Sequence, residues 1–197
     1  MSLDLLLALA VFAFATSITP GPNNLMLMAS GANFGFRRSV PHMLGIGLGF
    51  VVMLVLVGLG LIRVFELYPV SHTILKVAAV AYMTWLAWKT ATAAGPANAT
   101  HAPRPLTFLQ AAAFQWVNPK AWAMALTALT IYAPDRSLGA VLVVALVFGA
   151  INLPAVSVWT VLGQQVARLL RSHRQRVIFN VTMAALLLLS LVPLLRP

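Results

Sequence analysis

Long runs of uncharged and mostly apolar residues dominate the chain, and short polar segments separate them. A helix needs about 20 predominantly apolar residues to cross a bilayer. Counting such runs predicts six membrane-spanning helices, at residues 5–36, 39–62, 70–94, 107–132, 137–167 and 177–195. The first run is long enough for one span and a further half-helix. The pattern therefore predicts an all-α integral membrane protein.

The start of the chain contains Ala13-Phe14-Ala15, which has the small-residue pattern of a signal-peptide cleavage site. A signal peptide also needs a basic region before its apolar core, and Asp4 stands there instead. We therefore expect the first segment to be retained.

Composition supports the membrane assignment. The 197 residues are 61% hydrophobic and 8% charged, with no cysteine, whereas a soluble domain carries about 25% charged residues. This excludes a soluble enzyme, a disordered tail and a secreted disulfide scaffold.

The net charge of +10 indicates membrane orientation and not nucleic-acid binding, because the basic residues lie between the apolar runs and do not form one basic face. Cytoplasmic loops of membrane proteins are enriched in Lys and Arg. The loops after the first, third and fifth spans hold most of the basic residues: Arg37, Arg38, Lys89, Arg104, Arg168, Arg171, Arg174 and Arg176. These loops are therefore predicted to be cytoplasmic, with both termini outside.

An Ala- and Pro-rich segment, 95–106, divides the chain into a first set of three spans (1–94) and a second set (107–197). Halves with three spans each must have opposite orientations, as in transporters built from inverted repeats. In each half, proline next to asparagine interrupts the first span, within 19–24 and 115–120. We therefore predict two inverted three-helix repeats, each with a broken first helix.

The two interruptions are the candidate chemistry. Proline lacks an N–H and clashes with the preceding turn, so it frees backbone carbonyls that can accept a cation. The next half-helix offers N–H groups and a positive dipole to a carboxylate. Together these groups match a zwitterion. A single proline is more simply a structural kink, but two breaks at matched places favour a binding site.

Lys120 lies about thirteen residues into the fourth span, where a cation costs on the order of 3 kcal/mol or more. It must be neutral, reach carbonyls at the helix break, contact water, or meet an anionic substrate group. Snorkelling along a tilted helix is the structural alternative. The preferred interpretation is a cavity lysine that stabilises a substrate carboxylate.

Other polar residues within spans are Gln115, Asn180 and Asn152, and each can line a cavity or bond across helices. We place His42 at a span end, so a buried metal site is not expected. Paired carboxylates and catalytic triads are absent from the sequence, so neither an enzyme nor a cofactor is predicted. The predicted substrate-binding residues are Pro20, Gly21, Pro22, Asn23, Asn24, Gln115, Asn118, Pro119, Lys120 and Asn152.

The chain resembles the LysE/RhtB family of bacterial amino-acid exporters. The resemblance rests on motifs along nearly the whole chain: residues 18–23 (ITPGPN), 45–49 (GIGLG), 81–83 (AYM), 117–121 (VNPKA), 152–159 and 162–163. It implies a homodimeric, multi-pass protein of the bacterial inner membrane that exports amino acids or close derivatives, driven by the proton gradient.

Two positions depart from the family pattern. Asn23 stands where the family often has aspartate, and Phe50 follows the glycines of the second span where an acidic or small residue is common. The usual acidic candidates for proton coupling are therefore missing, and facilitated efflux or coupling through Lys120 stay open. The few acids favour neutral amino acids. The alternative is a channel-like or structural membrane protein in which both breaks are kinks.

Overall fold

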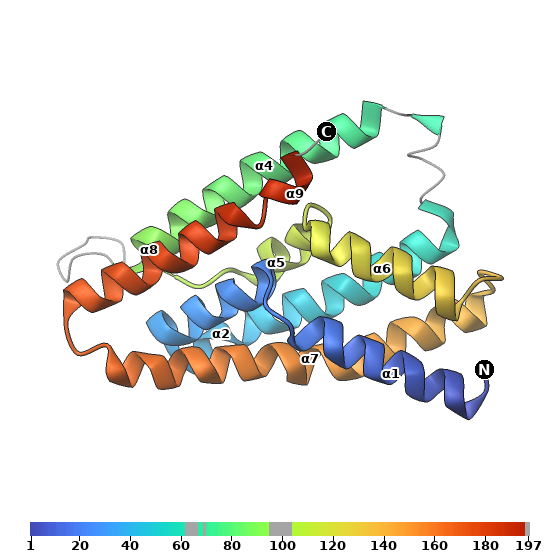
Figure 1. Cartoon of the computed structure of the whole chain (residues 1–197), viewed down its shortest axis with the longest axis horizontal. Helices are drawn as coiled ribbons and strands as arrows, with labels where there is room; N and C mark the ends of the chain where they lie inside the picture. The colour runs from blue at the N-terminus through green and yellow to red at the C-terminus, as the bar shows by residue number, and fades with distance from the viewer. Residues whose placement is uncertain (62–66, 69, 95–103, 196–197) are drawn as a thin grey trace.

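The computed structural model describes residues 1–61, 67–68, 70–94 and 104–195, and this part of the chain is helical, with no strand. Figure 1 shows the helices in one elongated bundle. Its elements are α1 (Leu3–Ile18), α2 (Pro22–Leu56), the π-helical turn η1 (Val57–Leu61), α4 (Val70–Ala91), the 3₁₀ turn η2 (Thr92–Ala94), α5 (Phe108–Gln115), α6 (Pro119–Tyr132), α7 (Leu138–Leu169), α8 (His173–Leu189) and α9 (Val192–Leu195). Most of the predicted connecting segment 95–106 lies outside the described residues.

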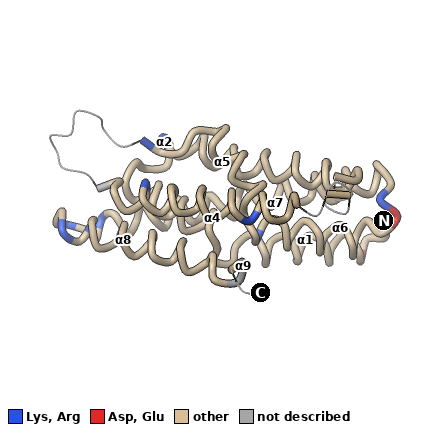
Figure 2. Tube along the Cα trace, turned by 90° about the horizontal axis from the view of Figure 1, so that it is seen from above, with Lys and Arg blue, Asp and Glu red and all other residues tan. Residues whose placement is uncertain are grey.

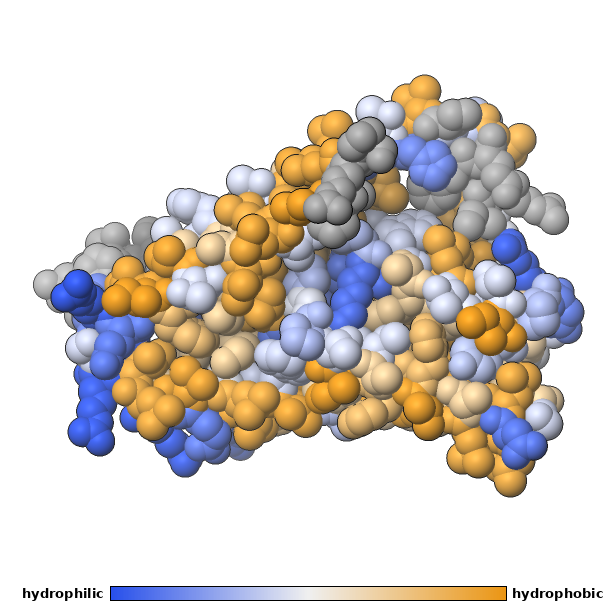
Figure 3. Space-filling view, viewed as in Figure 1, coloured by the Kyte–Doolittle hydropathy of each residue, from blue (hydrophilic) through white to orange (hydrophobic). Residues whose placement is uncertain are grey.

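Several of these helices can cross a membrane. By length and composition, the stretches Pro22–Leu61, Val70–Ala91 and Leu138–Leu169 qualify, and α1 is a shorter apolar helix. Large apolar side chains such as Leu7 and Leu146 are more than half exposed, and Figure 3 shows apolar residues over much of the visible surface. Such a surface suits lipid and not water, in agreement with the predicted membrane class.

Both predicted helix breaks are present. α1 ends at Ile18 and α2 begins at Pro22; we call the intervening residues 19–21 the α1–α2 break. α5 ends at Gln115 and α6 begins at Pro119; residues 116–118 form the α5–α6 break. In each case proline occupies the first turn of the following helix, where its missing N–H leaves no hydrogen bond unmade.

α2 is itself a helical hairpin. Gly35 has a φ of 78°, a left-handed value that glycine tolerates and other residues rarely adopt. Across this point the hydroxyls of Ser30 and Ser39 are hydrogen-bonded at 2.7 Å, although nine residues of straight helix would separate them by about 13 Å. The kink therefore lies at the end of the predicted first span, 5–36, just before the predicted second span, 39–62.

Glycines allow the closest helix contacts. A Cβ atom at Gly31 would collide with the carbonyl of Thr160 on α7, and one at Gly163 with the carbonyl of Met28 on α2. Gly45 and Gly49 lie equally close to the backbone of α5. Close backbone contact therefore requires glycine at positions 31, 45, 49 and 163, whereas Gly35 meets nothing within 4 Å and serves the kink instead.

Two groups of helices surround the centre of the molecule. The largest apolar core is formed by α1, the later part of α2, α6 and α7, with Phe12, Phe50 and Phe148 in edge contacts. α4 packs along α8 and forms a second cluster with residues from α2 and α5. In Figure 1 the α4–α8 pair slants away from α1 and α6, and the break residues lie between the groups.

Basic residues gather at one end of the bundle. Figure 2 shows several of them at the start of α8 and near α2, at the end opposite the N-terminus, while others lie near mid-length and beside the N-terminus. Arg171, Arg174 and Arg176, near the start of α8, belong to a loop that the sequence predicts to be cytoplasmic.

Candidate functional site

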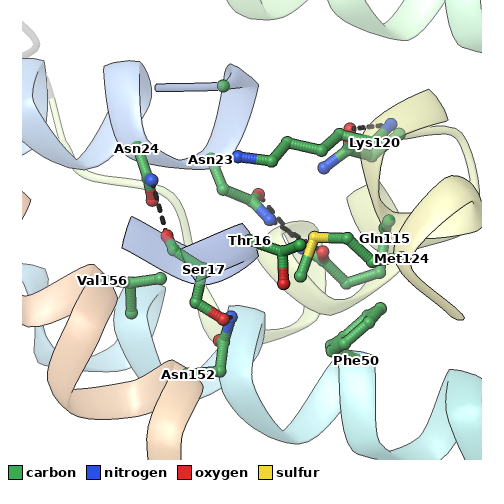
Figure 4. Close-up of a pocket in the computed structure, with 13 residues that line it drawn as sticks. Thr16, Ser17, Asn23, Asn24, Phe50, Gln115, Lys120, Met124, Asn152 and Val156 are labelled. Atoms are coloured by element: carbon green, nitrogen blue, oxygen red, sulfur yellow. Dashed lines mark hydrogen bonds between the residues drawn. The ribbon is translucent and has the colours of Figure 1, made fainter. Parts of the chain in front are cut away.

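The two helix breaks face each other across a small cavity in the middle of the bundle (Figure 4). Its walls come from α1, α2, α5, α6 and α7, and its lining residues are Thr16, Ser17, Gly21, Asn23, Asn24, Phe50, Gln115, Asn118, Lys120, Ala121, Met124, Asn152 and Val156. The cavity volume is about 20 Å³, which is room for about one water molecule. An amino acid therefore does not fit between the two breaks in this conformation.

The α1–α2 break exposes a row of carbonyl oxygens. Thr19 and Gly21 are extended, with ψ values of 147° and 175°, so the carbonyls at the end of α1 cannot form helical hydrogen bonds. Side chains from elsewhere in the chain satisfy them. Asn24 donates to the carbonyls of Ser17 and Thr19 at 2.8 and 2.7 Å, and the indole of Trp159 on α7 donates to the carbonyl of Ile18 at 3.0 Å.

Lys120 completes this set from the other break. Its Nζ donates to the Thr19 carbonyl at 2.7 Å, to Thr19 Oγ1 at 2.9 Å and to the Pro20 carbonyl at 3.3 Å. An ammonium has three donors, and three acceptors surround this one. Reaching the carbonyls of a helix break was among the alternatives that the sequence left open, and it is the one that the structure shows.

The path of Lys120 requires a glycine. A Cβ atom at Gly21 would lie 2.6 Å from Cδ of Lys120 and 3.1 Å from its Nζ. The aliphatic stem of the lysine therefore lies directly against the backbone at position 21. Any larger residue there would displace the lysine or the chain.

The α5–α6 break positions the lysine. The side chain of Asn118 accepts from the backbone N–H of Lys120 at 3.1 Å and caps α6. Such a cap stabilises a helix by about 1 kcal/mol. It also fixes Lys120 in the first turn of α6, which points its side chain at the opposite break.

An amide pair joins the two breaks directly. Asn23 Nδ2 donates to Gln115 Oε1 at 2.9 Å, and Gln115 Nε2 donates back to Asn23 Oδ1 at 3.2 Å. Gln115 is fully buried and also donates to the carbonyl of Ala111. The pair therefore closes one wall of the cavity.

Asn152 contributes an unused acceptor. Its Nδ2 donates to Ser17 Oγ at 3.1 Å, while its Oδ1 is buried without a hydrogen-bond partner. Buried polar atoms are normally satisfied, so this oxygen is available to a donor that enters the cavity.

Seven of the predicted site residues line the cavity: Gly21, Asn23, Asn24, Gln115, Asn118, Lys120 and Asn152. Pro20 contributes its carbonyl to Lys120, whereas Pro22 and Pro119 begin α2 and α6 and do not line the cavity. The sequence analysis missed Thr16, Ser17, Phe50, Ala121, Met124 and Val156. Residue type alone does not distinguish these from the other small or apolar residues of the spans.

Two other polar residues lie outside the cavity. Asn180 is buried and pairs reciprocally with Asn33 at 2.7 and 3.0 Å, so it bonds across helices instead of lining the site. His42 is 1% exposed and lies seven residues after the Gly35 kink, so it is buried near the start of the predicted second span.

The described residues contain no group of three or more His, Cys, Asp or Glu side chains that could hold a metal. Lys120 is the one ionisable group among the described residues that line the cavity. The site therefore offers a lysine, backbone carbonyls and amide side chains. Groups of this kind can bind a small charged or polar solute.

Comparison with known proteins identifies the family. The model of the LysE type translocator family matches residues 14–196. The chain belongs to this family.

Members of the LysE family with assigned names are similar along nearly the whole chain. A cysteine/O-acetylserine efflux protein of Escherichia coli strain K12 is 32% identical over 190 residues, or 95% of each chain. The protein of the same name from Shigella flexneri is 32% identical over 186 residues, or 93% of each chain. No solved structure matches significantly. The resemblance derived from the sequence motifs is thus confirmed, and the chain is a membrane transporter of an amino-acid efflux family.

Proposed function

We propose that this protein exports neutral amino acids or their close derivatives from the cytoplasm. The observation that carries the proposal is the pair of facing breaks, with a half-buried lysine on a row of carbonyls in the middle of an apolar bundle. Its relatives are named for efflux of cysteine and O-acetylserine, both of which are small zwitterions with a neutral side group. Figure 3 shows a hydrophilic patch between apolar surfaces near the middle of the molecule.

The two poles of a zwitterion fit different parts of the site. The carbonyls of Thr19 and Pro20 and the free Oδ1 of Asn152 are acceptors for a substrate ammonium. Lys120 and the N-terminal turns at Pro22 and Pro119 are positive and suit the carboxylate. With a neutral side group the substrate requires no further charge, and the lining residues supply none.

The wider architecture belongs to the same proposal. Six spans in two inverted three-helix repeats place one break in each repeat, and alternating access then exposes the site to either side. The basic end of the bundle faces the cytoplasm, with both termini outside. A homodimer in the bacterial inner membrane and proton antiport complete the proposal, on the basis of the family resemblance.

Proteoliposomes test the proposal. Purified protein is reconstituted, the vesicles are loaded with labelled amino acids that include L-cysteine and O-acetyl-L-serine, and loss of label is followed with and without unlabelled solute outside. We expect counterflow of at least one neutral amino acid. A folded, reconstituted protein that moves none of them would instead support the channel-like or structural alternative, in which both breaks are kinks.

A further inference from the structure

Lys120 occupies the position that a substrate ammonium needs. Its Nζ is held by the carbonyls of Thr19 and Pro20 and by Thr19 Oγ1, within 3.3 Å. These are the freed acceptors at the C-terminal end of α1, where the helix dipole also favours a cation. The ammonium of a solute that enters from solution would therefore compete with Lys120 Nζ for these oxygens.

The two cations exclude each other. The cavity around Lys120 has a volume of about 20 Å³, so a solute fits only when the lysine moves. The other described lining residues, from α1, α2, α5, α6 and α7, carry no negative charge that could hold two ammonium groups together. Asp4 lies at the start of α1 and Asp135 between α6 and α7, away from the cavity.

A displaced Lys120 then needs a new partner. Amide groups occupy much of the rest of the cavity, and Asn23 and Gln115 are already paired with each other. Thr19 and Pro20 lie at the exposed edge of the site, and a lysine displaced inward, toward the buried amides, would be an unpaired ammonium, which is disfavoured. A carboxylate carried by the same solute supplies the missing anion.

We propose that Lys120 is a tethered cation that closes the site and selects zwitterions. A solute opens it only by supplying an ammonium for the Thr19 and Pro20 oxygens together with a carboxylate for Lys120. Simple amines and inorganic cations satisfy the first condition and fail the second, so the site rejects them. This inference rests on the proposed function and adds the physical basis of its substrate class.

The first experiment needs no knowledge of the substrate. Lys120→Ala removes the side chain beyond Cβ, and the missing fragment corresponds to n-propylammonium. We expect this amine to bind purified Lys120→Ala at least about tenfold more tightly than wild type, because the competing charge is gone. Calorimetry or a thermal shift in detergent measures the binding.

Matched variants separate this effect from non-specific amine binding. Lys120→Arg keeps the charge and should remain closed to n-propylammonium. Lys89→Ala removes a lysine that lies over the Trp85 ring at the end of α4 and should behave as wild type. Equal responses in all four proteins, or a folded Lys120→Ala that does not bind the amine, overturn the proposal. Lys120→Met tests the same loss of charge at nearly constant volume if the alanine variant does not fold.

A second experiment uses transport. Cysteamine is L-cysteine without its carboxylate, so wild-type counterflow should be inhibited by L-cysteine and not by cysteamine at the same concentration. In Lys120→Met the preference should shift toward cysteamine by at least about tenfold, measured as competition for amine uptake into proteoliposomes. An unchanged preference contradicts the proposed role of Lys120 in selecting zwitterions. Absence of all amino-acid counterflow in wild type would instead refute the proposed function and leave the n-propylammonium result to decide the role of Lys120.

Discussion

At the α1–α2 break, three successive carbonyls after Ser17 are satisfied by side chains from distant parts of the chain, Trp159 on α7 and Lys120 on α6. At the α5–α6 break the chain satisfies itself. The backbone N–H groups of Trp116, Val117 and Asn118 donate to carbonyls three residues earlier. Both breaks contain proline and asparagine, yet distant side chains satisfy the carbonyls at the first break, whereas at the second the Trp116 carbonyl accepts from Trp122, only six residues on.

The difference separates two roles that the sequence presents as one. A break that closes its own hydrogen bonds is a rigid turn, and here it directs Lys120 across the cavity. A break whose carbonyls accept from side chains can exchange those donors for a ligand, because the backbone polar groups stay satisfied in either state. We therefore regard the α1–α2 break as the binding element and the α5–α6 break as its positioning element.

The largest expected effect is the loss of the lysine that connects the breaks. Lys120→Ala should reduce amino-acid counterflow by about a hundredfold or more, because the substrate carboxylate loses its charged partner. Insertion and folding should persist, since the α6 cap uses the backbone N–H of residue 120. Counterflow in proteoliposomes measures the loss, and Lys89→Ala is the control. Transport near the wild-type rate in Lys120→Ala would remove the lysine from the site.

The next comparison removes one asparagine from each break. Asn24→Ala takes away the donor to the carbonyls of Ser17 and Thr19, which should destabilise the protein by about 1–3 kcal/mol. Asn118→Ala removes a single cap and should cost about 1 kcal/mol. Thermal unfolding in detergent shows which of the two variants is the less stable. If the Asn118 variant is the less stable of the two, the proposed division between the breaks is wrong.

The sequence predicted both breaks and most of the polar residues around the cavity, because proline and amide side chains are rare enough within apolar spans to stand out. It could not predict that Lys120 reaches carbonyls about a hundred residues away, since that contact depends on how α6 packs against α1. Trp159 was missed for a related reason: only the rotation of α7 decides whether its indole meets the carbonyl of Ile18. The sequence placed His42 near the start of the second span but could not predict its burial, since burial at that position depends on how the helices pack.

A matched pair of tryptophans tests the two breaks with the same chemical change. Trp159→Phe removes the donor to the Ile18 carbonyl, and Trp122→Phe removes the donor to the Trp116 carbonyl. Each loss should cost about 1 kcal/mol of stability. Counterflow should fall by about two- to tenfold for Trp159→Phe and stay within about twofold for Trp122→Phe. Only Trp159→Phe changes the carbonyls of the α1–α2 break. Equal effects on transport would mean that the two breaks contribute alike.

The smallest effect concerns the direct link between the breaks, the amide pair of Asn23 and Gln115. If the breaks act as one closed unit, Asn23→Leu and Gln115→Leu should be non-additive. Interhelical hydrogen bonds in membranes give coupling energies of about 0.6–1.7 kcal/mol in double-mutant cycles, and we expect a value in that range from thermal unfolding of the four proteins. The Asn33–Asn180 pair, which has the same chemistry outside the cavity, provides the reference cycle. If substitutions at Asn23 and Gln115 change the transport rate and substitutions at Asn33 and Asn180 do not, the Asn23–Gln115 link affects the site as well as the stability of the bundle. Additive Asn23 and Gln115 substitutions would mean that Lys120 alone connects the two breaks.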